Sequence, residues 1–150
     1  MKLKTVLLIG LIVAVLSAAY VWFFIYNKPK KNILESKADY TLTVAQLVQE
    51  FETNHDSAIA KYNDKVLEIS GEVTRIEPND SISSVVFKSG DKYEVFCEVH
   101  PEYNAQAKQL ASPQKVVLKG LFISAEKPDT DFDLPGLVRL KKSSFSKEGN

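Results

Sequence analysis

Cysteine and histidine are the side chains in this sequence best suited to metal binding or nucleophilic chemistry, and the chain contains one cysteine and two histidines. Cys97 and His100 stand in a Cys-x-x-His arrangement. A structural zinc ion needs four ligands, and only His55 and carboxylates remain to complete the set. A nucleophilic thiol needs a thiolate-stabilising neighbour and an orienting third group, and no third group is evident. Cys97 falls on the apolar face of a predicted strand, so we expect it to pack in the core.

Carboxylates form a second group with chemical potential. Asp129, Asp131 and Asp133 alternate along the chain, and their oxygens are the ligands that Ca²⁺ prefers. An EF-hand loop requires Gly at its sixth and Glu at its twelfth position, and counting from Asp129 these are Leu134 and Leu140. We therefore favour a solvated loop over a weak, irregular cation site. No catalytic residue, metal or cofactor is predicted, and we expect the protein not to be an enzyme.

One face of a predicted strand is a candidate site for non-covalent ligand binding. Lys92, Glu94 and Phe96 alternate on the wet face of the strand predicted over 92–99. Phe96 can stack on a ligand, although cover by the N-terminal helical segment is the alternative. We expect the ligand to lie across this face or at the acidic loop 124–135, because loops on rigid scaffolds commonly carry binding.

Charge argues against nucleic acid as that ligand. All 19 acidic residues lie at or after Glu35, whereas five of the 19 basic residues lie before it. The part of the chain that follows residue 31 has 14 basic and 19 acidic residues, a net charge of −5. Binding to phosphate backbones is driven mainly by Lys and Arg, so the sequence disfavours nucleic acid.

An apolar segment near the N-terminus is the first element that organises these residues. Residues 5–26 contain no charged side chain and follow a basic N-terminus, residues 1–4. As a helix they extend about 33 Å, against roughly 30 Å of bilayer hydrocarbon. Their Leu, Ile, Val and Phe favour insertion by roughly 4–8 kcal/mol. The side chains expected to contact the bilayer include Val6, Leu11, Trp22, Phe23 and Tyr26.

A cleaved signal peptide is the alternative to a retained transmembrane anchor. Ser17-Ala18-Ala19 resembles a cleavage site, but the apolar run continues through Ile25, where signal peptides become polar. A short basic N-terminus predicts export of the following domain, although the lysines after the span point the other way. We expect a single-pass protein of a bacterial inner (cytoplasmic) membrane, with its domain in the periplasm or outside the cell.

Hydrophobic periodicity predicts one domain over residues 42–145, between a polar tether (27–41) and a flexible tail (146–150). Thr43 and Gln46 form a capping box at the start of a helix from 44 to about 53. A second helix capped by Asp56 or Ser57 ends at Tyr62. From Lys65 the apolar period changes to two. Strands are predicted from 65 and over 84–88, 92–99, 115–123 and 136–145, and a helix over 102–110.

Five strands with a helix between the third and fourth have the order of an OB-fold barrel. A mixed sandwich with covering helices is the alternative. Gly71 and Gly120 interrupt two strands, and glycines mark bulges or bends where a barrel closes. The predicted fold class is β-rich (α+β), with an N-terminal helical segment and one preceding transmembrane helix.

Three stretches and the helix that precedes them resemble a known family. They are Ala60-Lys61-Tyr62, residues 65–73 and Val117-Leu118-Lys119-Gly120, and the helix contains residues 43–47. In these the chain is similar to the bacterial tRNA_anti-like OB-fold proteins, small membrane-anchored or lipoprotein chains. The resemblance implies an OB-fold, an extracytoplasmic location and no catalytic residues. The cysteine that lipoprotein members acylate is absent after the span, so a lipid anchor on cysteine is excluded.

The leading interpretation is a non-enzymatic, membrane-anchored OB-fold module that binds a protein, peptide or saccharide. One alternative is a structural subunit of a membrane complex, since Gly10 and Ala14 permit close helix packing. The other is a nucleic-acid-binding OB-fold protein that faces the cytoplasm.

Overall fold

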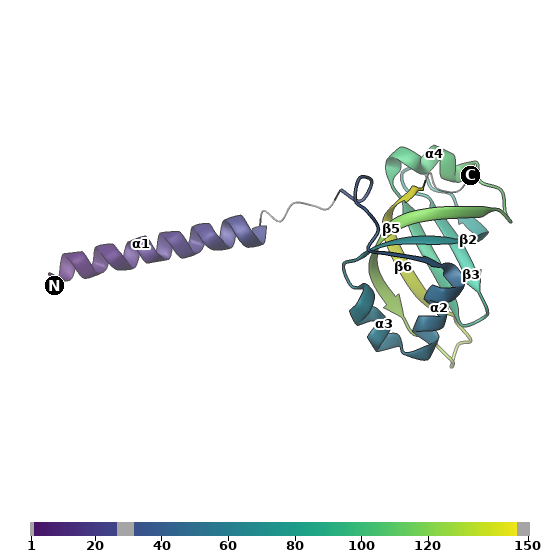
Figure 1. The fold of residues 1–150 in the computed structure, drawn as a ribbon, viewed down its shortest axis with the longest axis horizontal. Coiled ribbons are helices and arrows are strands. Elements are labelled where there is room, and N and C mark those ends of the chain that lie inside the picture. Colours follow the sequence, from purple (N-terminus) through teal and green to yellow (C-terminus); the bar gives the residue numbers. More distant parts are fainter. Residues whose placement is uncertain (1, 27–31, 147–150) are drawn as a thin grey trace. The chain divides into compact units, whose positions relative to one another are not determined.

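The computed structural model describes residues 2–26 and 32–146 and divides the chain into two units, Met1–Lys31 and Asn32–Asn150 (Figure 1). In the first unit α1 (Leu3–Val21) continues into a π-helical turn (Trp22–Tyr26). Its segment Leu3–Phe24 is long and apolar enough to cross a membrane, a test that signal sequences also pass. Val6 and Leu11 on α1, and Trp22 and Phe23 in the π-helical turn, are all exposed.

Two consecutive helices lie near the start of the second unit. The Thr43–Gln46 capping box forms as predicted at the start of α2 (Val44–Thr53). A single residue, Asn54, separates α2 from α3 (His55–Tyr62). The cap of α3 is Asn54, whose side chain accepts from the Ser57 N–H at 3.0 Å, and neither Asp56 nor Ser57 serves as the cap. The extended backbone of Asn54 ends α2 and also starts α3, so the turn is too short for a later cap.

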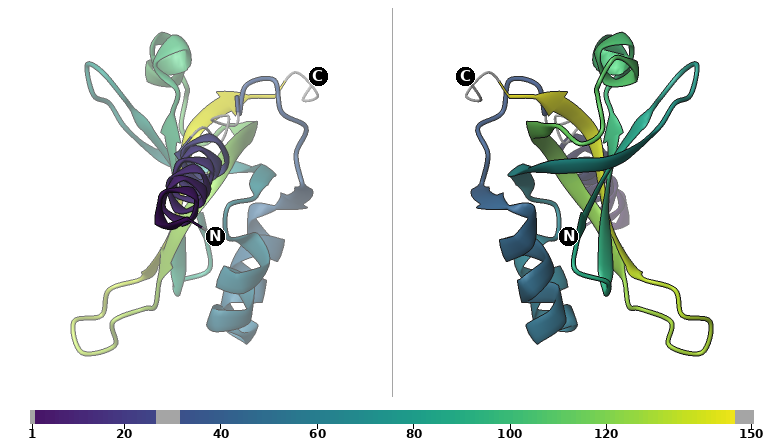
Figure 2. Two further views of the ribbon diagram at one scale, coloured as in Figure 1. Left: turned by 90° about the vertical axis from the view of Figure 1, so that its left-hand side faces the viewer. Right: turned by 90° about the vertical axis from the view of Figure 1, so that its right-hand side faces the viewer.

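The barrel predicted from the strand order is present. Its strands are β2 (Val66–Glu77), β3 (Ser84–Ser89), β4 (Tyr93–Val99), β5 (Lys115–Glu126) and β6 (Gly136–Phe145). They pair in the order β2-β3-β4-β6-β5, and β5 pairs back onto β2 to close the barrel. A 3₁₀ turn (Pro101–Tyr103) and α4 (Asn104–Lys108) occupy the predicted helical connection. Figure 2 shows α4 and the β5–β6 loop at opposite ends of the barrel.

A sixth strand, β1 (Tyr40–Thr43), was not predicted. It pairs in parallel with β2 from Leu67 to Ser70. The Asp39 carboxylate accepts from the Val66 N–H at 2.8 Å, and Ile33 is buried. Residues 32–41, assigned to the tether from sequence, therefore pack in the compact unit, while the rest of that segment, 27–31, lies outside the described residues. Four residues are too few for an alternating pattern to identify a strand.

The core fills the barrel and the space under α2. Phe51 lies among the rings of Phe122, Tyr93 and Tyr62, with centroid separations of 6.0, 6.0 and 6.2 Å. All four side chains are buried. α2 contributes the apolar stripe predicted from its periodicity, with Val44, Leu47, Val48 and Phe51 buried. This stripe joins the helix to the barrel.

Cys97 packs in this core, as its strand position predicted. Its side chain is inaccessible to solvent, and burial raises the pKa of the thiol well above its ordinary value. We expect Cys97 in the native protein to resist alkylation by iodoacetamide and to react within minutes in strong denaturant. Mass spectrometry of the quenched reaction measures both rates, and fast native labelling would show an accessible thiolate instead.

Candidate ligand-binding face

Four side chains form one row across the outside of the barrel. Strand register places Arg75 opposite Val86, Val86 opposite Phe96, and Phe96 opposite Arg139. Phe96 is half-buried and Val86 is fully buried within the row. The guanidinium carbon of Arg75 lies 5.3 Å from the centroid of the Phe96 ring, a cation–π contact. We call this row and the glutamates that pair with its arginines the Phe96 face.

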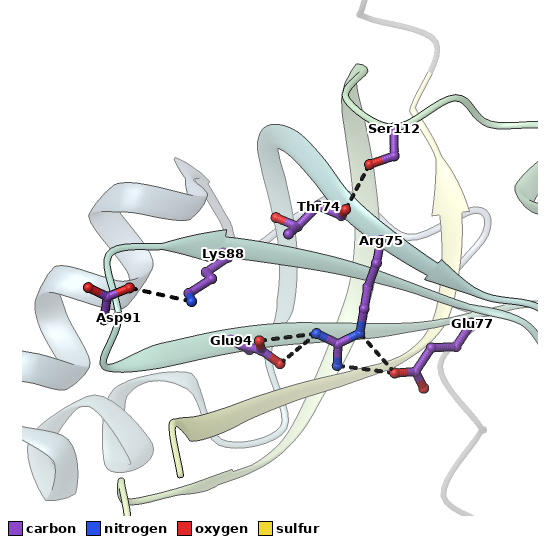
Figure 3. A network of polar contacts seen from close by, with 7 residues as sticks. All are labelled: Thr74, Arg75, Glu77, Lys88, Asp91, Glu94 and Ser112. Atoms are coloured by element: carbon purple, nitrogen blue, oxygen red, sulfur yellow. Dashed lines mark hydrogen bonds and ion pairs between the residues drawn. The ribbon is translucent and has the colours of Figure 1, made fainter. Parts of the chain in front are cut away.

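A β-bulge puts Arg75 into the row. Counting by two from Val73, which is buried, would direct Arg75 into the core. The register of β2 against β3 shifts between Val73 and Arg75, so the side chains beyond the shift change faces. The Ser112 hydroxyl donates to the Thr74 carbonyl at 2.7 Å (Figure 3) and shares this proton with the Val73 carbonyl at 3.2 Å. Ser112 therefore holds the bulge from a different part of the chain.

Replacing Ser112 with alanine removes both of these hydrogen bonds. We expect the free energy of unfolding to fall by about 1 kcal/mol, the net worth of such a bond. We also expect faster hydrogen exchange at the amides of residues 73–76. Denaturant unfolding and hydrogen exchange measure the two effects. Unchanged exchange at the bulge would show that β2 holds it without help.

Glutamates neutralise both arginines of the face. Arg75 Nη1 lies 3.1 Å from each Glu94 carboxylate oxygen, and Arg75 also contacts Glu77 at 3.1 Å (Figure 3). The hydrogen bond to Glu94 raises the pKa of Arg75, and Glu77 adds to this. Arg139 lies 3.5 Å from Glu126. The Phe96 face therefore carries two positive and three negative charges.

The structure brings together part of the site predicted from sequence. Glu94 and Phe96 lie on the face as expected, and Glu94 forms a salt bridge with Arg75. Lys92 lies before the start of β4, where its carbonyl accepts from the Gly136 N–H at 2.7 Å. Phe96 is half-buried, and Arg75 lies over its ring.

The aspartates predicted as a binding loop form the turn of the β5–β6 hairpin. Asp129 accepts from the N–H groups of Asp131 and Phe132 at 3.0 and 3.3 Å. Asp133 adopts a positive φ of 52°. β5 extends to Glu126, so the loop is shorter than the predicted 124–135. The Asp129 carboxylate thus shapes the turn, and among the described residues no three His, Cys, Asp or Glu side chains gather as a metal site.

Sequence reasoning missed Arg75 and the hydrophobic tip of this loop. Phe132 and Leu134 are 74% and 57% exposed, and the loop continues directly into β6, the neighbour of β4. Two apolar residues within an otherwise polar loop were the available signal for the tip. No comparable signal marks Arg75, because its orientation depends on the bulge.

One solved structure supports this fold, and others match it less well. A crystal structure of a candidate nucleic acid-binding lipoprotein from Klebsiella pneumoniae matches with a TM-score of 0.53 and 18% identity, over 71% of this chain and 91% of that one. Aspartyl-tRNA synthetases from Leishmania major and Entamoeba histolytica match with TM-scores of 0.46 and 0.44 and identities of 16% and 10%. These matches cover 77% and 73% of this chain but only 22% and 25% of the synthetases.

No curated protein matches the sequence. The profile of the tRNA_anti-like family matches residues 1–128, which include α1, the N-terminal helices and the first four strands of the barrel. Since that match covers well over half of the chain, the protein belongs to the tRNA_anti-like family.

Proposed function

We propose that the protein is a non-enzymatic binding module, anchored in the bacterial cytoplasmic membrane by α1, that holds a protein, peptide or saccharide ligand on the Phe96 face. The observation that carries this proposal is the charge balance of the face. Its aromatic ring is partly accessible, but the two arginines beside it are already paired with glutamates. Such a face offers an apolar centre and a polar rim, and it lacks the unpaired positive charge that phosphates require.

Single-stranded nucleic acid is the second candidate ligand. A stacking ring beside an arginine is a common feature of OB-fold nucleic-acid sites, and the Klebsiella protein is described as a candidate nucleic acid-binding lipoprotein. The net charge of the face and of the domain opposes it. The two candidates therefore make different predictions for the glutamates. If the ligand is nucleic acid, the glutamates repel its phosphates, and if it is a protein, peptide or saccharide, they have no such effect.

An oligonucleotide titration separates these candidates. We expect the full-length protein in detergent micelles to show no saturable binding of a labelled 12-nucleotide single-stranded RNA or DNA at physiological salt. The variant E77Q/E126Q releases part of the positive charge, so at low salt it should bind roughly three- to tenfold better than the native protein. Fluorescence anisotropy measures both. Micromolar binding by the native chain that is lost in Phe96→Ala would establish the second candidate instead.

The membrane anchor and the side of the domain need a separate experiment. We expect the chain to remain in the pellet after alkaline carbonate extraction of membranes. Protease added to spheroplasts should digest the domain, and protease added to intact cells of a Gram-negative host should not. A soluble mature chain that begins near Tyr20 would identify α1 as a signal peptide. A domain protected in spheroplasts would place it in the cytoplasm.

A structural subunit of a membrane complex remains distinguishable from a binding module. Replacing residues 5–26 with an unrelated transmembrane segment preserves ligand binding if the domain alone makes the contacts. Loss of a co-purified partner after this exchange would show that α1 itself carries the association.

A further inference from the structure

A groove lies beside β1, away from the residues of the Phe96 face. β1, α2 and α3 line this open groove, whose volume is about 620 Å³, within the usual range for ligand sites. Thr41 and Leu42 line it from β1, Gln49 and Thr53 from α2, and Ser57 and Lys61 from α3. No residue of this lining belongs to the row around Phe96, so the groove is a second candidate site in the described part of the chain.

One wall of the groove is a strand edge. Among the described strands β1 has a single neighbour, β2. The Asp39 N–H points to β2, where it donates to the Val66 carbonyl at 2.8 Å. Asp39 precedes β1, whereas within the strand the Thr43 N–H donates to Gln46 Oε1 in the groove wall at 2.9 Å. Because successive backbone groups of a strand point to opposite edges, the N–H and C=O groups of Thr41 face the same free edge. An extended chain can pair with such an edge by strand addition.

The opposite wall is a second stripe of α2. Gln46, Gln49, Glu50 and Thr53 recur at i, i+3, i+4 and i+7, next to the stripe that packs on the barrel. Gln46 is already engaged in the capping box. The Gln49 amide can both donate and accept, which suits the alternating N–H and C=O groups of an extended chain.

The charged side chains of the lining cancel each other. Lys61 Nζ lies 2.9 and 2.8 Å from the two Glu50 carboxylate oxygens, and the Tyr62 hydroxyl donates to the same carboxylate at 2.7 Å. Lys61 also lies over the ring of Tyr40, 5.3 Å from its centroid. The lining has no other charged residue. A charged ligand would have to break this pair, so the groove is electrostatically matched to an uncharged one.

We propose that this groove binds an extended, uncharged polypeptide segment of a partner protein, which adds as a strand to the free edge of β1. β1 has four residues, so the paired segment is short, about 13 Å at roughly 3.3 Å per residue. Backbone pairing supplies most of the affinity, and the sequence preference comes from alternate side chains that face Gln49 and Thr53. This site is independent of the ligand held on the Phe96 face.

The experiment uses the full-length protein in detergent micelles and a library of N-acetylated, C-amidated pentapeptides that lack charged side chains. We expect a subset of these peptides to bind with a Kd below 1 mM, as measured by fluorescence polarisation in competition. A library without any such peptide would overturn the proposal. Saturable binding of tetra-N-acetylchitotetraose that is lost in Gln49→Trp, with no peptide bound, would also overturn it, because the groove would then hold a saccharide.

Two variants tie the binding to β1. Thr41→Pro removes the N–H that faces the free edge, and proline is tolerated where that group points away from the sheet. Thr41→Ala is its matched control, since it removes the side chain but keeps the N–H. We expect at least a tenfold loss of affinity in Thr41→Pro and less than threefold in Thr41→Ala, with circular dichroism showing both folded. Equal losses would contradict strand addition.

A third variant keeps the test decisive if Thr41→Pro does not fold. Gln49→Trp fills the groove from α2 without changing a residue of β1, and Glu52→Trp places the same side chain on an exposed position outside the lining. Peptide affinity should fall at least tenfold in Gln49→Trp and stay unchanged in Glu52→Trp. Retained affinity in Gln49→Trp would place the peptide elsewhere. Oligonucleotide behaviour should be unaffected in both, which separates this result from the test of the Phe96 face.

Discussion

Replacing Phe51 with alanine lowers the free energy of unfolding by about 3–5 kcal/mol, the range found for large-to-small changes at buried aromatic positions. The ring is 1% exposed and contacts three other buried rings. Its loss leaves a cavity where α2 meets the barrel, and cavities of this kind collapse only partly. Guanidinium unfolding of the full-length chain in micelles, followed by near-ultraviolet circular dichroism, measures the change.

Phe132→Ala is the matched control for this substitution. It makes the same chemical change at a side chain that is 74% exposed on the β5–β6 loop. We expect it to alter the free energy of unfolding by less than about 0.5 kcal/mol. Similar losses for the two variants would mean that Phe51 does not organise the junction of helix and barrel.

Replacing Gly71 with alanine destabilises the fold by about 1–3 kcal/mol, because a methyl group overfills a packed site. A Cβ atom at position 71 would lie 2.6 Å from Val44 Cγ2 and 3.3 Å from Phe87 Cδ1. Val44 opens α2 and is buried against β2. The close approach of α2 to the sheet therefore requires glycine at this position.

A double-mutant cycle tests the cause of that loss. Val44→Ala removes the Cγ2 atom that the new methyl group would meet. We expect Gly71→Ala to cost at least 1 kcal/mol less in the Val44→Ala background than in the native chain, since contacting residues are energetically coupled. Additive losses would show that the cost of Gly71→Ala comes from the strand and not from the helix packed on it.

The role of Gly71 also shows where sequence patterns were insufficient. Both interrupting glycines predicted a bulge or a bend. At Gly120 the β5–β6 register does shift, between Lys119 and Leu121. Gly71 pairs regularly with Val116, and the bulge of β2 lies at Thr74 instead. A glycine within a strand can mark a bulge or the close approach of another element, and sequence alone does not distinguish these two causes.

Local periodicity predicted the elements whose signals lie within the chain itself. The capping box fixed the start of α2, and alternation in β4 correctly put Cys97 inside and Phe96 outside. Long, regular segments carry enough repeats for this. β1 escaped prediction because four residues show too little pattern, and its partner β2 lies well downstream in sequence.

The site was less predictable than the fold because it depends on strand register. Phe96 and Glu94 were identified on their own strand, but their partners come from β2 and β6. The bulge at Thr74 reverses the face on which Arg75 lies, and Ser112, far along the chain, stabilises that bulge. Counting charges along the sequence suggested an acidic domain. Only the pairing of each arginine with a glutamate shows that the face itself lacks free positive charge.

Photo-crosslinking from position 96 in native membranes tests the account most directly. p-Benzoylphenylalanine replaces Phe96 in the full-length chain, and the same group at Asn63, exposed at the end of α3, is the control. We predict a discrete protein or glycan adduct from position 96 that is absent from position 63 and is lost when Arg139→Glu disturbs the face. Adducts to nucleic acid, or equal adducts from both positions, would contradict a ligand held on the Phe96 face.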